Sequence, residues 1–324
     1  MNGTMKEALM YAIGDLRVVE SPIPTYNQNE VLMRVKVCSV CPTDIRKYRT
    51  GNHGVLKLPM NLGHEFSGDI VEVGSLVPYL KPGMRVLGDG FVGYAQYATV
   101  PEEYMSLCLE LPPAVTYEEA TFAEPLADCV YCIERQANVK INDKIAIIGA
   151  GPMGLMKMMV AKRAGIKVMH VDVLEHRLGW ARKFGADLAV KADEMEKVAK
   201  EWTDGKGLDA VILSAGVPDA VNKALIMVKN RGHVVLFGGF KHGSMSTIDP
   251  NLIHYKEAVL TGSYWVGVKP YQDQTYYLKS LELIAEKTVP VAQLITHRFP
   301  LDQIEEAFKV MESLEGLKVM VEIP

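Results

Sequence analysis

The sequence lacks an excess of positive charge and any long apolar run. Its 35 lysines and arginines are outnumbered by 39 aspartates and glutamates, and the formal net charge is −4. No basic face is therefore expected, which argues against nucleic acid as a partner. The longest stretches without Asp, Glu, Lys or Arg span 12 residues, at 90–101 and 145–156. Both are too short to cross a bilayer, so no membrane partner is expected either.

The cysteines are few, and their number is odd. Five cysteines cannot all pair in intrachain disulfides, so the cytoplasm is the expected compartment. Cys38 with Cys41, and Cys129 with Cys132, have the CxxC spacing of structural zinc ligands. The two pairs are 87 residues apart, however, against about 15–20 in a zinc ribbon. We interpret Cys38, Cys108, Cys129 and Cys132 as structural and keep Cys41 as a candidate metal ligand.

The chain is long enough for two domains, and the sequence pattern changes near residue 124. Before that point, short alternating segments with Gly and Pro between them predict a β-rich domain. After it, apolar strands alternate with helices of 10–15 residues, which predicts an α/β fold with a doubly wound parallel sheet. Helices are predicted over 125–137, 152–164, 174–184, 219–228, 276–287 and 303–314, and strands over 30–40, 144–149, 167–171, 209–214, 233–238 and 318–323.

A glycine-rich turn follows the strand predicted at 144–149. Gly149, Gly151 and Gly154 form a GxGxxG motif, with Pro152 and Met153 inside it, and an acid, Asp172, ends the next predicted strand. Such glycines permit a tight turn, close approach of a pyrophosphate and tight packing of the helix on the strand. A carboxylate at this position accepts from ribose hydroxyls and repels a 2′-phosphate, which favours NAD over NADP. Arg177 on the following helix is a further cofactor-binding candidate.

Zinc-type ligands occur in three short segments of the first 124 residues. These are Cys41-Pro-Thr-Asp, Gly-His64-Glu65 and Glu124-Pro-Leu-Ala. A thiolate, an imidazole and a carboxylate together suit a catalytic zinc with one open position. Taken singly, each residue has a simpler interpretation: a core thiol, a surface histidine or a salt-bridge acid. Their occurrence beside a dinucleotide motif favours the metal site, with Glu65 or Glu124 as the acidic ligand.

In this order, the motifs resemble the zinc-dependent medium-chain alcohol dehydrogenases, closest to the sorbitol (polyol) and threonine dehydrogenase branch. The resemblance extends to Ile295-Thr-His-Arg-Phe-Pro-Leu and Glu305-Glu-Ala-Phe near the C-terminus. It implies a GroES-like catalytic domain over 1–123, a Rossmann domain over 124–263, and a return to the catalytic domain over 264–324.

The resemblance also implies roles for individual residues. The zinc ligands would be Cys41, His64 and either Glu65 or Glu124, and Thr43 would touch the substrate oxygen. The four-cysteine lobe of many relatives is absent, because 82–86 runs almost directly into 93–97. One catalytic zinc and no structural zinc are therefore expected.

The usual proton-relay histidine is replaced by Arg46, which stays protonated and is expected to bind the cofactor phosphate instead. His53 is the alternative relay residue. Thr43, Glu65 and His53 are accordingly the catalytic candidates.

The predicted reaction is reversible oxidation of a secondary alcohol by NAD, with zinc as Lewis acid. Tyr48 and Glu124 could hold further hydroxyls, which suits a polyol, sugar acid or inositol-like substrate. The alternatives are a threonine-type amino-alcohol dehydrogenase, a zinc-free NADPH quinone or enone reductase, and a non-catalytic redox protein. An edge strand over 259–263 could pair two copies, so a homo-oligomer, dimer or tetramer, is expected.

Overall fold

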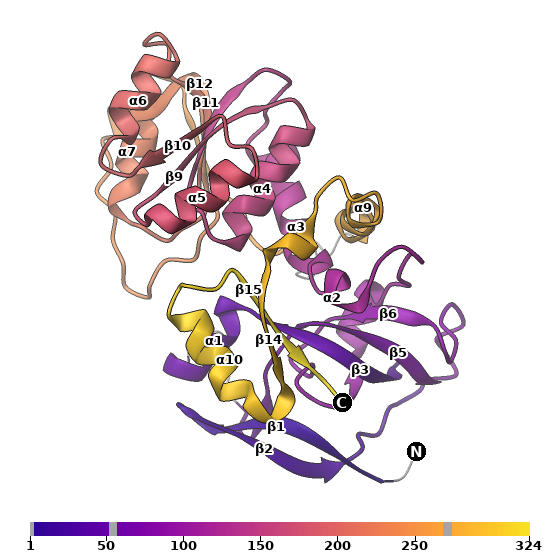
Figure 1. Ribbon diagram of the computed structural model, residues 1–324. Helices are drawn as coiled ribbons and strands as arrows, with labels where there is room; N and C mark the ends of the chain where they lie inside the picture. The colour runs from indigo at the N-terminus through magenta and orange to yellow at the C-terminus, as the bar shows by residue number, and fades with distance from the viewer. Residues whose placement is uncertain (1–2, 52–56, 268–273) are drawn as a thin grey trace. The chain divides into compact units, whose positions relative to one another are not determined.

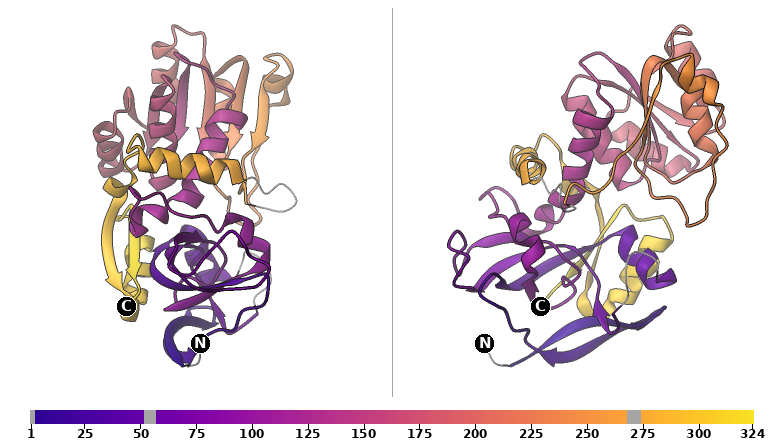
Figure 2. Two further views of the ribbon diagram at one scale, coloured as in Figure 1. Left: turned by 90° about the vertical axis from the view of Figure 1, so that its right-hand side faces the viewer. Right: turned by 180° about the vertical axis from the view of Figure 1, so that it is seen from behind.

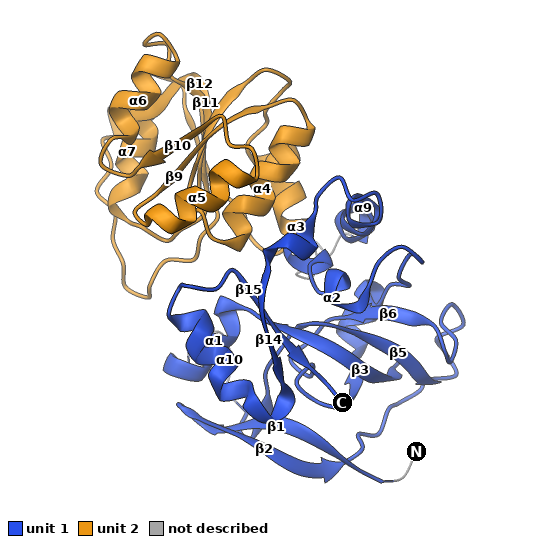
Figure 3. Ribbon diagram, in the orientation of Figure 1, with its two compact units in different colours: residues 1–125, 269–324 blue, residues 126–268 orange. Residues whose placement is uncertain are grey.

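The computed structural model describes residues 3–51, 57–267 and 274–324 (Figure 1). The chain forms two compact units (Figure 3): unit 1 contains residues 1–125 and 269–324, and unit 2 contains residues 126–268. Within the described ranges, no helix combines the length and the apolar character that crossing a membrane requires.

Unit 2 is built on a six-stranded parallel sheet with helices on both faces (Figure 2). The strand order is β10-β9-β8-β11-β12-β13, so the first strand in sequence, β8, lies in the middle and the order reverses beside it. This is the doubly wound Rossmann arrangement, in which ligands bind where the order reverses. Its strands are β8 (Lys144–Ile148), β9 (Lys167–Asp172), β10 (Leu188–Lys191), β11 (Leu208–Leu213), β12 (Val228–Leu236) and β13 (Val259–Gly262).

The helices of unit 2 follow the strands in strict alternation. They are α4 (Pro152–Arg163), α5 (Glu175–Lys183), α6 (Met195–Trp202), α7 (Asp219–Met227) and α8 (Pro250–His254). The helix predicted over 125–137 is α3 (Ala123–Tyr131), continued by a π-helical turn over Cys132–Gln136. Both β10 and α6 were missed by the pattern. The segment predicted as an edge strand is β13, which in the described part of the chain pairs with β12 and with no other strand.

Unit 1 contains a three-stranded sheet, β2-β1-β4, and a larger mixed sheet, β14-β15-β3-β5-β6, with β7 also paired to β3. The strands are β1 (Thr4–Ala12), β2 (Asp15–Pro22), β3 (Val31–Val40), β4 (Met60–Asn61), β5 (Glu65–Val73), β6 (Arg85–Gly88), β7 (Tyr97–Val100), β14 (Ile295–Pro300) and β15 (Lys318–Glu322). Its helices are α1 (Pro42–Thr50), α2 (Tyr117–Ala120), α9 (Gln274–Ala285) and α10 (Ile304–Glu312), with 3-10 turns at Glu102–Leu107, Val291–Leu294 and Leu301–Gln303.

The core of unit 1 forms where these strands pack against α1 and α10. Tyr48 on α1 and Tyr94 both meet the ring of Phe308 on α10 edge-on, with centroids 5.4 and 5.9 Å away. Edge-to-face contacts of this kind add about 0.5–1.5 kcal/mol to the burial of the rings. They fix α1, whose N-cap residue Cys41 belongs to the candidate site, against the C-terminal segment.

Strand register brings distant parts of the sequence to one place. In the antiparallel pair β3–β5, Ser39 lies opposite Glu65, and in the pair β15–β3, Val319 lies opposite Val40. The start of β5, the end of β3 and the start of β15 therefore meet. The fold class predicted from the sequence, a Rossmann sheet plus a β-rich domain, is confirmed.

Candidate metal centre and dinucleotide site

Three of the predicted ligands meet at the end of β3 in unit 1. The ligand atoms of Cys41, His64 and Glu65 all lie within 4.8 Å of one another. Cys41 is the N-cap residue of α1. His64 directly precedes β5, and Glu65 is the first residue of that strand. A thiolate, an imidazole and a carboxylate at such separations match the donor set of zinc and leave room for a fourth ligand. The residues present therefore fit the metal.

A glycine makes this convergence possible. Gly63 has φ of +84°, and a Cβ there would lie 2.8 Å from Cys38 Sγ and 2.9 Å from the Tyr94 ring. Any larger residue would push the strand away from the thiol and ring beside it. Gly63 thus sets the position of His64, the next residue.

The imidazole of His64 is held from one side by a buried carboxylate. Its Nδ1 lies 3.0 Å from Asp44 Oδ1. Asp44 is fully buried and also accepts hydrogen bonds from the backbone N–H groups of Cys41 and Gly63 and from the hydroxyl of Tyr94. A carboxylate that contacts Nδ1 in this way fixes the ring orientation and leaves Nε2 for a metal. Asp44 belongs to the Cys-Pro-Thr-Asp segment but had no role in the sequence prediction.

Glu65 is shared with a lysine that the sequence did not single out. Lys318, the first residue of β15, forms a buried ion pair with Glu65, and the Ser39 hydroxyl donates to the same oxygen, Oε2. The two charged side chains are only 4% and 1% exposed. Because both contacts use Oε2, Oε1 is the oxygen open to a metal.

The other candidate acid, Glu124, lies outside the three-residue cluster. It is half-buried near the start of α3, and its charge acts on Lys318. Lys318 therefore lies within the electrostatic reach of both acids. The geometry favours Glu65 as the ligand.

The charges within the cluster are strongly coupled. Burial raises the pKa of the Cys41 thiol, and the nearby Glu65 charge raises it further. Burial opposes protonation of His64, yet the charges of Asp44 and Cys41 together hold its pKa well above the ordinary value. A cation is thus stabilised among these groups, and a metal ion would replace the proton because its ligands must be deprotonated.

Two other candidate residues lie on α1. Thr43 and Arg46 are half-buried on this helix. Tyr48 donates its hydroxyl to the Gly14 carbonyl at 3.0 Å and packs in the core, so the expectation that it holds substrate hydroxyls is wrong. His53 lies outside the described residues.

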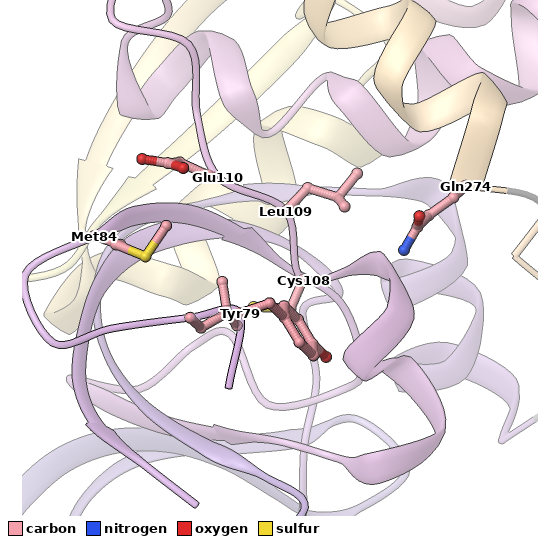
Figure 4. A pocket seen from close by; sticks show the side chains of 7 residues that line it. Tyr79, Met84, Cys108, Leu109, Glu110 and Gln274 are labelled. Atoms are coloured by element: carbon pink, nitrogen blue, oxygen red, sulfur yellow. The ribbon is translucent and has the colours of Figure 1, made fainter. Parts of the chain in front are cut away.

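A separate surface pocket in unit 1 involves none of these residues. It is a hollow of about 370 Å³ lined by Tyr79, Leu80, Met84, Cys108, Leu109, Glu110 and Gln274 (Figure 4). Burial raises the pKa of Cys108 to about 12, so this thiol stays protonated at neutral pH. The structural role predicted for Cys108 agrees with this environment.

In unit 2, the glycine-rich turn has the geometry its motif predicts. Gly149 has φ of +108°, and a Cβ on Gly154 would lie 1.9 Å from the Gly149 carbonyl oxygen. Gly151 begins α4 and has no side chain to cap it. The first N–H groups of α4 are therefore available to an anion, which the helix dipole also favours.

Asp172 and Arg177 lie beside this turn. The carboxylate of Asp172 accepts from the N–H of Ala150 at 2.7 Å and from that of Leu174 at 2.9 Å. A Cβ on Gly151 would be 3.3 Å from an Arg177 guanidinium nitrogen, which places this cation against the turn. The turn, the acid and the arginine thus form one cluster at the carboxyl edge of the sheet.

Two buried basic residues contact backbone carbonyl groups of the glycine-rich turn, and the sequence pattern indicates neither of them. His170 Nε2 lies 3.1 Å from the Gly149 carbonyl oxygen, and burial lowers the pKa of this histidine to about 4. Lys157 on α4 donates to the Met153 carbonyl and the Ser214 hydroxyl, with its ammonium over the Phe237 ring. Both lie in stretches whose apolar pattern gave no signal for a polar side chain.

Comparison with known proteins places both units in one family. The alcohol dehydrogenase GroES-like domain matches residues 27–113, and the zinc-binding dehydrogenase domain matches residues 152–286. D-arabitol-phosphate dehydrogenase of Enterococcus avium is 32% identical, covering 99% of this chain and 97% of that protein. Sorbitol dehydrogenase of Bos taurus is 32% identical over 97% of this chain and 94% of its own.

Other relatives extend the comparison to amino alcohols and to solved structures. L-threonine 3-dehydrogenase of Legionella pneumophila is 31% identical, covering 93% of this chain and 94% of its own. The crystal structure of 2R,3R-butanediol dehydrogenase from Bacillus subtilis superposes with a TM-score of 0.87 at 27% identity, covering 98% of this chain and 99% of its own. The chain therefore belongs to the zinc-binding medium-chain alcohol dehydrogenases, in their polyol dehydrogenase branch.

Proposed function

We propose that the protein transfers hydride reversibly between NAD and a secondary alcohol, with a polyol, sugar acid or inositol-like compound as substrate. The observation that carries this proposal is the convergence of Cys41, His64 and Glu65 in a chain that also holds a dinucleotide-binding turn. The polyols in the names of two relatives support the substrate class.

One zinc ion per chain would be held by Cys41, His64 and Glu65. When bound, zinc supplies Lewis acidity, which makes an alcohol hydroxyl easier to deprotonate near neutral pH. Asp44 keeps Nε2 of His64 directed at the metal, and Lys318 with Ser39 holds one oxygen of Glu65.

Thr43 carries the proton step in this proposal. It lies two residues after Cys41 in the first turn of α1, half-buried. Its Oγ1 would accept the substrate's hydroxyl proton while giving its own proton to a solvent water, and it would also orient the alcohol oxygen. Arg46 on the same helix retains its proton and would instead bind a cofactor phosphate.

NAD is the proposed cofactor, rather than NADP, because of Asp172. Its carboxylate at the end of β9 would accept from the ribose hydroxyls and repel a 2′-phosphate. A dehydrogenase structure from Sinorhizobium meliloti, 25% identical, is bound to NADP, so the choice needs a direct measurement. Asp172→Ser should reduce the preference for NAD by about tenfold or more, as measured by cofactor dissociation constants. An unchanged ratio would remove Asp172 from this role.

The decisive experiment measures metal and activity on the same preparation. After exhaustive dialysis, about one zinc per chain should remain, and a panel of polyols and sugar acids should give NADH absorbance that a chelator abolishes. A metal-free protein that reduces quinones or enones with NADPH would refute the proposal.

We also propose a cytoplasmic homo-oligomer. All five cysteines are free thiols in the structure, which suits a reducing compartment. Among the described residues, strand β13 is paired with β12 alone, and its first residue, Val259, is 42% exposed. Pairing of this edge with its copy about a two-fold axis would give a dimer, which scattering or sedimentation would detect.

A further inference from the structure

Lys47, a buried lysine on α1, forms no ion pair with the part of the chain that the structure describes. Lys47 is only 4% exposed. Within residues 3–51, 57–267 and 274–324, its ammonium forms no hydrogen bond or ion pair, and its contact is the face of Phe91, 3.6 Å from the ring centre. Lysines are almost never buried to this degree without a partner, because desolvating the charge is costly.

The nearest acid is already fully used. Asp44 lies one turn earlier on α1, but its two oxygens accept from two backbone N–H groups, the Tyr94 hydroxyl and the His64 ring. A carboxylate has about four acceptor positions, so Asp44 has none left for the ammonium. A cation–π contact uses the ring face and leaves the three N–H donors of Lys47 free for another ligand.

This ammonium lies beside the candidate metal centre. The ring of Phe91 packs on that of His64, with centroids 4.9 Å apart and planes tilted by 53°. Lys47 Nζ lies 3.6 Å from the Phe91 ring centre, and that centre lies 4.9 Å from the His64 ring centre. The ammonium is therefore within the length of a small sugar of the His64 ring. A molecule of polyol size that placed one hydroxyl at the metal could reach the ammonium with its other end.

We infer that Lys47 is a specificity residue that binds the anionic group of the substrate, a phosphate ester or a carboxylate on a polyol chain. This inference rests on the proposed function, since it uses the metal centre as the anchor for the reacting hydroxyl. The charge of Asp44 acts on Lys47, and the substrate would supply an oxyanion that the ammonium can contact directly. A charge-assisted hydrogen bond between an ammonium and an oxyanion is the strongest contact this side chain can make.

The test compares neutral and anionic forms of the same carbon chains. Pentitols and hexitols, their phosphate monoesters and the corresponding aldonates are assayed with wild type, Lys47→Met and Lys47→Arg. Wild type should favour one anionic form in kcat/KM, and Lys47→Met should lower that preference about 10- to 100-fold, mostly through KM. Lys47→Arg should restore part of the anion preference. Comparing the phosphate monoesters with the aldonates shows which of the two anionic groups Lys47 binds.

A second readout does not depend on turnover. Calorimetric titration of the zinc-loaded protein with a pentitol phosphate and with an aldonate should show weaker binding of at least one of these anions in Lys47→Met than in wild type. Lys6→Met is the matched control: it removes the same charge from an exposed lysine of unit 1 that pairs with Asp302. Its anion preference should equal that of wild type.

The outcomes separate the inference from the proposed function. Equal use of neutral and anionic polyols by wild type, or an equal loss for both in Lys47→Met, would overturn the role of Lys47 and leave the dehydrogenase proposal intact. No oxidation of any alcohol would overturn the proposed function, and the titration would then decide whether Lys47 binds anions. Weaker binding in Lys6→Met as well would show a non-specific charge effect and overturn the inference.

Discussion

Replacing Lys318 by Met tests whether Glu65 is shared between a lysine and a metal ion. The ammonium contacts the carboxylate that would bind zinc, so lysine and metal would share one counter-ion. At an effective dielectric constant of about 20, a divalent and a monovalent charge about 5 Å apart repel by about 6–7 kcal/mol before a shared carboxylate screens them. If the substitution relieves only a fifth of this, zinc binds about tenfold more tightly.

Without metal, the same change should be destabilising. Removing one partner of a buried ion pair typically costs about 3–5 kcal/mol, because the remaining charge is left buried and uncompensated. Zinc would supply a positive charge in its place. The loss of stability should therefore be smaller in the zinc-loaded protein, by the same free energy that the metal gains in binding.

Zinc dissociation constants are measured by competition with a chromogenic chelator, and unfolding is followed by circular dichroism with and without zinc. Lys318→Arg keeps the charge and should change zinc affinity little. All three tryptophans, Trp180, Trp202 and Trp265, lie in unit 2, so their fluorescence serves as an internal control for that unit. Unchanged or weaker zinc binding in Lys318→Met would show that Glu65 does not bind the metal. If zinc is lost in Glu124→Gln but Lys318→Met leaves zinc binding unchanged, Glu124 is the ligand.

Three further predictions concern the turn, a buried histidine and the proton step. Gly154→Ala should destabilise unit 2 by about 2–4 kcal/mol and weaken NAD binding, because the added Cβ would lie 1.9 Å from the Gly149 carbonyl oxygen. Gly179→Ala is the control. Gly179 lies in α5 with open space around it, so this substitution should be neutral or slightly stabilising. Because the folded pKa of His170 is about 4 against 6.5 for an ordinary histidine, the unfolded chain binds the proton more readily. Stability should fall by about 3 kcal/mol as the pH drops from about 6.5 to 4, and His170→Gln should lack this component in pH-dependent urea unfolding. Thr43→Ala should lower kcat by about 100-fold with little effect on the NAD dissociation constant; an unchanged kcat would remove Thr43 from the proton path.

The sequence predicts the dinucleotide turn well because each part of it is local. Gly149, Gly154 and Asp172 lie within one βαβ unit, and the tight turn, the helix packing and the acid each follow from neighbouring residues. The strands of unit 2 are predicted for the same reason, since a buried parallel strand reads as a continuous apolar run. The short β10 and the amphipathic α6 lack such runs or clear punctuation, and they were missed.

The candidate metal centre was predicted only as a set of residue types. That Cys41, His64 and Glu65 come together depends on the β3–β5 register, which a pattern of alternating residues does not specify between strands. The contact between Glu65 and Lys318 spans 253 positions of sequence and depends on the pairing of β15 with β3. No local signal marks Lys318, because a lysine at the start of a strand is usually exposed.

The buried acids of the candidate centre have different tasks, and their hydrogen bonds explain why. Asp44 accepts from two backbone N–H groups, one hydroxyl and one imidazole, all supplied by neighbouring structure, so it stays fixed and orients His64. Glu65 accepts from one hydroxyl and one ammonium through a single oxygen, and its other oxygen remains open. A carboxylate with both oxygens saturated has none left for a metal, whereas one held on a single oxygen can bind a metal through the other. The two buried lysines differ in the same way: Lys318 is in direct contact with its counter-ion Glu65, whereas Lys47 makes no ion pair with any described residue. We therefore expect Lys47, and not Lys318, to bind a charged substrate.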